Sequence, residues 1–171
     1  MAQKTEVYKE NFKHTGYWKY KEVYDMMFHW FKDHGYKISE DLYNEKIISN
    51  GKEVVIEWKA AKKVTDYFEY TIMADWHILG MKDVEVEVDG KKVKTNNGEV
   101  EIIFKGLLVK DYEKRWEDRP LWKFLRGVYE RYIVRATVDE FEDNVEDDVR
   151  ELVGDLKAFL KLESTTMLER P

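Results

Sequence analysis

The stretch FEYTIMADWHI, residues 68–78, places apolar or aromatic side chains at every second position. Successive side chains of a strand point to opposite faces, so these residues share one face of a sheet. The set comprises Phe68, Tyr70, Ile72, Ala74, Trp76 and Ile78, preceded by Val64 and interrupted by Asp66. Such a strand is typical of an antiparallel sheet with one face on a core and the other in water. Gly80 is predicted to end it.

A turn signal before this strand predicts two more strands. Asn50-Gly51 separates LYNEKIIS from KEVVIEWKAA, and this dipeptide favours the two-residue turn of a hairpin. One face of the second arm carries Val54, Ile56, Trp58 and Ala60. A first strand is predicted at residues 5–13, and Gly16 is predicted to end it.

The alternation continues after Gly80. The valines of VEVEV, residues 84–88, are expected to point into the core before a tight turn at Asp89-Gly90. Another strand is predicted after Asn97-Gly98, with a bulge or bend at Gly106.

Two regions show the three- and four-residue spacing that is typical of helices. Residues 18–34 form the first, and Gly35 stands where a left-handed C-terminal cap favours glycine. Pro120 suits the first position of the second region, with Asp118 as its cap. The stripe predicted to face the core there is Leu121, Leu125, Val128 and Tyr132.

A capping box, TVDE at residues 137–140, predicts a new helix or a kink in this second region. The helical pattern then continues to about Leu162. Whether the C-terminal region is one helix or two stays open.

Together these elements predict an α+β fold, in which a curved antiparallel meander of about five to six strands is packed by an N-terminal helix and a long or kinked C-terminal helical region. Residues 1–162 are predicted to form one domain, and residues 163–171 a flexible tail. The order of elements resembles the helix-grip arrangement of START-like proteins. That resemblance implies a C-terminal helix lying across a curved sheet around a cavity.

Composition narrows the function. The formal net charge of -6 speaks against binding to bulk DNA. Cysteine is absent, which excludes disulfides, thiol catalysis and cysteine-based zinc sites. Neither a signal peptide nor an apolar run of membrane-spanning length is present, so a cytoplasmic protein without a membrane partner is expected.

The polar face of the central strand holds a weak cluster that comprises Tyr67, Glu69, Thr71, Asp75 and His77. A carboxylate beside an imidazole can orient it as a base. Neighbours on one face of a strand stand ~7 Å apart, however, which is too far for a direct hydrogen bond unless the strand bends. The cluster is therefore interpreted as a solvated face, or as a contact if a second protein covers the sheet.

No catalytic, cofactor-binding or metal-binding residue is predicted. His29 and His34 are five residues apart, whereas helical metal ligands favour a spacing of four. The acidic run at residues 139–148 keeps a helical period, which indicates a solvated helix face and not a calcium loop. Phosphate-binding glycine motifs do not occur in the sequence.

The segment at residues 114–135 holds seven basic and three acidic residues in this acidic chain. Arginine and large aromatics are enriched at interface hot spots. The candidate partner-binding residues are Arg115, Arg119, Trp122, Arg126 and Arg131. Pairing of the arginines with the acidic helix that follows would equally explain the segment.

We therefore predict a non-enzymatic structural or protein-interaction module, with self-association as one form of it. An alternative is a binder of an apolar small molecule in a cavity between the sheet and the C-terminal helix. A second alternative is RNA binding through the basic aromatic segment at residues 114–135.

Overall fold

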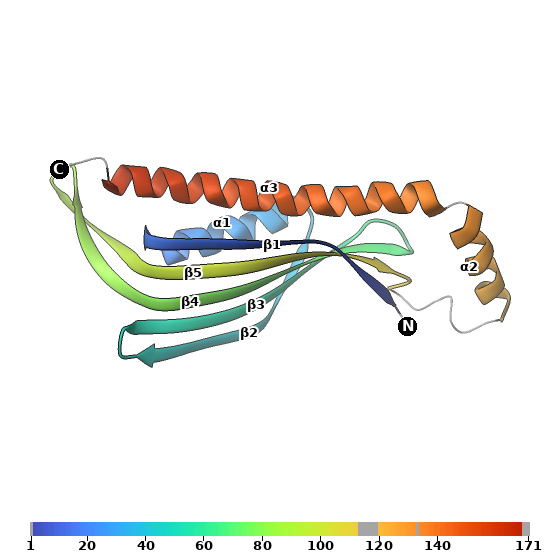
Figure 1. Cartoon of the computed structure of the whole chain (residues 1–171), viewed down its shortest axis with the longest axis horizontal. Helices are drawn as coiled ribbons and strands as arrows, with labels where there is room; N and C mark the ends of the chain where they lie inside the picture. The colour runs from blue at the N-terminus through green and yellow to red at the C-terminus, as the bar shows by residue number, and fades with distance from the viewer. Residues whose placement is uncertain (1, 113–119, 133, 169–171) are drawn as a thin grey trace.

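The computed structural model describes residues 2–112, 120–132 and 134–168, which form an antiparallel sheet with two helices along its inner face and a third helix at one end (Figure 1). The strands are β1 (Gln3–Trp18), β2 (Lys37–Ile48), β3 (Gly51–Lys63), β4 (Phe68–Val88) and β5 (Lys91–Lys110). The helices are α1 (Tyr20–Asp33), α2 (Pro120–Tyr132) and α3 (Val134–Leu168). The strand order is β1-β5-β4-β3-β2. The fold is α+β with a five-stranded antiparallel sheet, as the alternation predicted.

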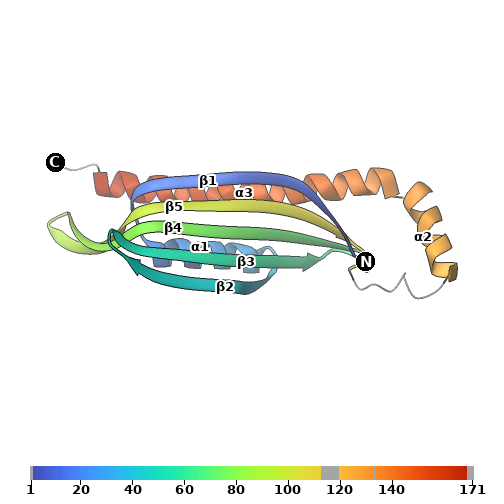
Figure 2. The same cartoon turned by 60° about the horizontal axis from the view of Figure 1, so that its bottom comes forward.

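The core lies between the sheet and the helices α1 and α3. The apolar faces predicted for β3 and β4 are buried there, which confirms the alternation. α3 lies along β1 and β5, whereas α1 lies over β3 and β4 (Figure 2). The buried side chains of the two helices are Val23, Met27, Trp30 and Phe31 of α1 and Val145, Val149, Leu152, Val153, Leu156 and Leu160 of α3.

Both long strands continue where the sequence predicted breaks. β4 runs through Gly80, and β5 runs through Asn97-Gly98, so these two predictions are wrong. A Cβ atom on Gly98 would lie 2.9 Å from the Cα of Met81. A Cβ atom on Gly51 would lie 2.6 Å from the carbonyl oxygen of Met81. The glycines therefore let adjacent backbones approach closely at a register shift of β4, and the strands do not end there.

Beyond this point, β4 and β5 form a two-stranded hairpin that extends past β3. Its tip is the predicted turn at Asp89-Gly90, where φ is 54° and 73°. The valines at positions 84, 86 and 88 are half-buried and not in the core. The prediction that they point into the core was wrong because the covering strands and helices of the main sheet do not enclose this hairpin.

The two earlier glycine signals were partly misplaced. Asn50-Gly51 marks a hairpin, but its turn lies one residue earlier, because Gly51 already pairs with Ile48. Gly16 does not end β1, which continues to Trp18.

Gly106 marks a close approach of helix to sheet. A Cβ atom there would lie 2.8 Å from Cγ1 of Val145 and 3.1 Å from Cγ2 of Val149, both on α3. The register shift at this level lies in the neighbouring strand β1, at Val7, where Tyr8 pairs with Gly106. The bulge predicted at Gly106 therefore belongs to its partner strand.

The strands β1 and β2 form the two edges of the sheet. β2 is exposed along most of its length. Its pairing with β3 shifts between Glu40 and Leu42, which leaves Asp41 as an extra residue in the edge strand.

The helices begin close to their predicted positions. α1 ends before Gly35, whose φ of 79° fits the predicted left-handed cap. α2 begins at Pro120, while Asp118 lies outside the described residues. α3 begins at Val134, so the capping box at residues 137–140 lies inside the helix and does not mark its start. The C-terminal region is thus described as two helices, and α3 continues past Leu162 to Leu168.

The position of α2 overturns one prediction about the core. Leu121, Leu125 and Val128 were expected to be buried, yet they are 65%, 40% and 40% exposed. The reason is that α2 turns away from α3 at the end of the molecule and does not lie on the sheet (Figure 1). The side chain of Tyr132 lies outside the described part.

Candidate interaction surface

Of the described helices and strands, α2 carries the largest number of exposed large apolar side chains. Phe124 is 69% exposed and lies beside Leu121, Leu125 and Val128. These positions are separated by three, one and three residues, so they share one side of a helix. We call these four residues the α2 stripe. A stripe of this kind normally packs on a core, so its exposure makes it a candidate interaction surface.

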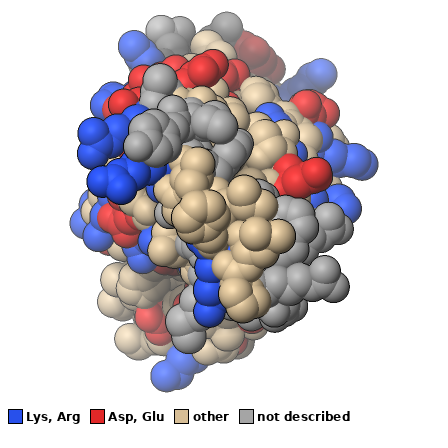
Figure 3. All heavy atoms as spheres, turned by 90° about the vertical axis from the view of Figure 1, so that its right-hand side faces the viewer, with Lys and Arg blue, Asp and Glu red and all other residues tan. Residues whose placement is uncertain are grey.

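Cationic side chains accompany the α2 stripe. Lys123 and Arg131 on α2 are exposed, as is Arg135 at the start of α3. Among the described side chains, no ion pair joins α2 to the acidic residues of α3. Viewed from this end, Lys and Arg side chains gather along one flank of an uncharged central region (Figure 3).

The structure describes the predicted partner-binding residues unevenly. Arg131 lies exposed on α2. Trp122 and Arg126 belong to the same helix, but their side chains are outside the described part. Arg115 and Arg119 lie outside the described residues altogether.

The predicted polar cluster of β4 does not form an acid–base pair. His77 Nε2 lies 2.9 Å from Glu53 Oε1 on β3, whereas Asp75 Oδ2 lies 3.5 Å from Lys105 Nζ on β5. Each side chain therefore pairs with a different neighbouring strand. A shallow hollow of about 250 Å³ lies between them on the outer face, lined also by Glu57 and Glu101.

The other three members of that cluster have structural roles. Thr71 is buried and donates a hydrogen bond to Glu69 at 3.4 Å. Tyr67 precedes β4 and belongs to the core, where its ring meets that of Phe68 at 4.9 Å. The imidazole–carboxylate contact in this region is therefore that of His77 with Glu53, and not the predicted one of His77 with Asp75.

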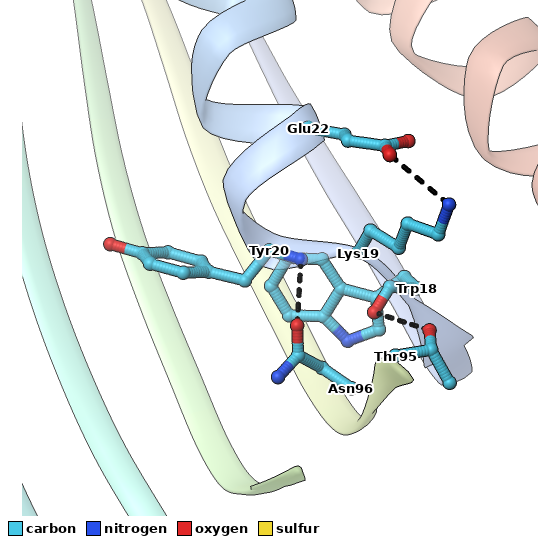
Figure 4. A network of polar contacts seen from close by, with 6 residues as sticks. All are labelled: Trp18, Lys19, Tyr20, Glu22, Thr95 and Asn96. Atoms are coloured by element: carbon cyan, nitrogen blue, oxygen red, sulfur yellow. Dashed lines mark hydrogen bonds and ion pairs between the residues drawn. The ribbon is translucent and has the colours of Figure 1, made fainter. Parts of the chain in front are cut away.

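A second polar network joins the start of α1 to β5 (Figure 4). Lys19 precedes the helix and its side chain does not cap it. Asn96 of β5 fulfils that role, because its Oδ1 accepts a hydrogen bond from the Tyr20 backbone N–H at 3.0 Å. Thr95 donates to the Trp18 carbonyl at 3.4 Å. This network fixes α1 on the sheet.

A hollow of about 510 Å³ borders this network. Its charged lining consists of three lysines and three carboxylates, so it has no net charge that would favour an anion or a cation. The charged lining residues are Lys19, Lys21, Lys94, Glu22, Asp83 and Glu85.

Sequence reasoning missed a third network, which links α1 to β2. Tyr24 Oη and Trp58 Nε1 both donate to Glu40 Oε2, at 2.7 and 2.9 Å. The Tyr20 and Tyr43 hydroxyls lie 3.5 Å apart. The spacing of residues 18–34 predicted a helix, but only the polar tips of the Tyr20 and Tyr24 rings could have signalled a carboxylate partner.

Burial and the Glu40 carboxylate raise the pKa of Tyr24 to about 12. Burial also raises the pKa of Tyr20, with a smaller effect from the Tyr43 hydroxyl. The pKa of Tyr36 is raised mainly by burial and further by its hydrogen bond to the Asp148 carboxylate.

These pKa values predict that the free energy of unfolding falls as the pH rises from about 10 to about 12. Below pH ~10 these tyrosines are neutral in both states, whereas above it the unfolded chain ionises first. Urea unfolding at about pH 9 and about pH 11 measures the loss. Tyr24→Phe is expected to lose less stability over this range than the wild type. Tyr17→Phe is the matched control, and equal losses in both variants would contradict the assignment to Tyr24.

Comparisons with protein-family models, with curated proteins and with solved structures give no match to this chain. Among the described residues, no group of three or more histidine and carboxylate side chains is placed to hold a metal ion. No helix in the described part of the chain has both the length and the apolar character needed to cross a membrane.

Proposed function

We propose that this protein is a non-enzymatic interaction module that binds a protein partner, or itself, through α2. The observation that supports this is the α2 stripe, an amphipathic helix face whose four apolar side chains are between 40% and 69% exposed. A helix with such a face typically inserts into an apolar groove of a partner.

The energetics favour Leu121 and Phe124 as the anchors. Fully burying a leucine or phenylalanine side chain stabilises a complex by roughly 1.5–3 kcal/mol. These two side chains are the most exposed of the stripe, so they have the most apolar area left to bury. The cations around them would contribute mainly to specificity and to the rate of association.

A second candidate function is the binding of an apolar small molecule between the sheet and α3, in a helix-grip arrangement. It is supported by the core tryptophans Trp18, Trp30 and Trp76, whose buried indole N–H groups have no hydrogen-bond partner among the described residues. Buried donors usually have one. Mass spectrometry of the native protein would detect a co-purified hydrophobic ligand in this case.

RNA binding through residues 114–135, the other alternative, would appear as binding that weakens steeply as the salt concentration rises.

The interaction function predicts that Leu121→Asp abolishes association. Leu162→Asp is a matched control, because Leu162 is a leucine of similar exposure, 70% against 65%, on α3. The measurement combines light scattering, where the monomer has a mass of 20.6 kDa, with a pull-down from cells that express the protein. We expect Leu121→Asp to lose associated protein and Leu162→Asp to keep it.

The arginines are tested separately. Replacing Arg126 and Arg131 by alanine is expected to weaken association while the midpoint of unfolding changes little, because exposed ion pairs contribute only ~0–1 kcal/mol. Association that survives both this double change and Leu121→Asp would contradict the proposed function.

A further inference from the structure

The inner face of β2 is only partly covered by α1, whose Tyr20 and Tyr24 reach Tyr43 and Glu40. Tyr43 and Glu45 pair with Ile56 and Val54 of the buried β3 face, and directly opposed residues of antiparallel strands share a face. Ile47 follows by alternation and is 81% exposed, while Tyr43 is 46% exposed. We call Tyr43, Glu45 and Ile47 the β2 surface.

The molecule thus has a partly covered sheet margin and a helix with an unused apolar face. α3 covers the sheet along β1 and β5 and α1 covers it along β3 and β4 (Figures 1 and 2). Over the β2 surface, the described contact with a helix is that of the Tyr43 hydroxyl, 3.5 Å from the Tyr20 hydroxyl of α1, while Ile47 stays exposed. The margin continues onto α1, where Phe28 is 40% exposed. A third helix placed beside α1 would complete the layer.

The dimensions and charges of α2 suit this position. A helix of this length is ~20 Å long, whereas Tyr43 and Ile47 are ~13 Å apart along an extended strand. α1 and β2 together hold four lysines against six carboxylates, whereas α2 holds three basic residues against one acidic residue. The elements that carry the two surfaces therefore have net charges of opposite sign, although Glu45 itself pairs with Lys52 at 3.0 Å.

Within one chain this contact is not made. α2 lies at one end of the molecule, and the turn between β2 and β3, next to Ile47, lies at the other end (Figure 1). Two copies placed side by side and antiparallel would bring each α2 to the β2 surface of the other copy.

We propose that two copies of this chain form a twofold-symmetric dimer in which α2 of each copy covers the β2 surface of the other. This inference rests on the proposed function, because it names a second copy as the partner of α2. The contact occurs twice, as twofold symmetry requires, so each copy contributes both a helix and a sheet margin. A stable interface needs ~800 Å² from each partner, whereas a two-turn stripe alone offers on the order of a few hundred Å². Pairing of α2 with α2 would therefore be too small.

Light scattering of the full chain over a range of concentrations tests the dimer. We expect a wild-type mass of twice 20.6 kDa, and a monomer for both Phe124→Glu and Ile47→Glu. Removing one hot-spot side chain weakens binding at least ~30-fold. Each variant loses both contacts of its dimer, so the dissociation constant should rise ~1,000-fold. Leu162→Asp is the control that should remain dimeric, and circular dichroism verifies that each variant is folded.

Mixing the two variants gives the decisive measurement. A mixed dimer keeps one intact contact, because α2 of the Ile47→Glu chain meets the β2 surface of the Phe124→Glu chain. We expect the mixture to dimerise ~30-fold more tightly than either variant alone. A wild-type dimer that Ile47→Glu leaves intact, or variants that do not complement each other, would overturn the proposal.

The outcomes also separate this inference from the proposed function. A wild type that is monomeric at every concentration, but whose α2 still retains another protein or binds anionic vesicles of phosphatidylserine and phosphatidylcholine, overturns the dimer. If α2 retains another protein, the interaction function stands. A wild type that is monomeric and binds nothing through α2 overturns both.

Discussion

Replacing Trp76 by alanine is expected to lower the free energy of unfolding by ~3–5 kcal/mol, the usual effect of emptying a buried tryptophan site. Trp76 is 1% exposed, and its ring lies 5.3 Å from that of Trp58 and 6.2 Å from that of Tyr24. The cavity would therefore open at the point where α1 meets the centre of the sheet. Urea unfolding measures the loss, and a change below ~1 kcal/mol would contradict the position of Trp76 in the core.

Trp76→Phe is the matched comparison. The indole N–H of Trp76 is buried without a partner in the described structure, so its removal relieves an unsatisfied donor. Phenylalanine keeps most of the apolar volume. We therefore expect Trp76→Phe to cost less than half as much stability as Trp76→Ala. Equal losses would indicate that the N–H group has a partner, such as a buried water or ligand.

Replacing Gly106 by valine is expected to cost at least ~2 kcal/mol. The first added carbon atom would already lie 2.8 Å from Val145 and 3.1 Å from Val149. Both are β-branched residues on a helix, whose side chains rotate little out of the way. α3 would have to move off the sheet, because the strand itself tolerates valine well. Thermal or urea unfolding measures the effect.

Gly154→Ala provides the control for this experiment. Gly154 lies on the exposed side of the same helix, and a Cβ atom there would meet nothing within 4 Å. Alanine in a helix interior is then expected to stabilise the protein by ~0.5–1 kcal/mol relative to glycine. If Gly106→Val were equally harmless, the close approach of α3 to the sheet would be wrong.

Periodicity predicted the parts of this fold whose side chains meet the core. Trp58, Ile72 and Trp76 were placed correctly because a strand with one apolar face must bury that face. Gly80 and Gly98 were wrongly predicted to mark the ends of strands. A glycine that permits a turn and a glycine that permits two backbones to touch look alike in a sequence, and only the neighbouring strands distinguish them.

The candidate interaction surface shows a second reason why sequence patterns predict a structure only in part. The amphipathic pattern of α2 predicted an apolar face correctly, but it could not tell whether that face meets the same chain or another molecule. Leu121 and Leu125 therefore appeared in the predicted core, although they are exposed. The hydrogen bonds of Tyr24 and Trp58 to Glu40 were out of reach for a related reason, since they join residues from three different elements.

The extra residue at Asp41 in β2 has a consequence for aggregation. An edge strand offers unpaired backbone groups to which another chain can add a strand, as in amyloid growth. Asp41 interrupts the regular ladder, and its charge, with those of Glu40 and Glu45 nearby, opposes the approach of a second strand. β2 can therefore remain exposed at the margin of the sheet without growing into a fibre.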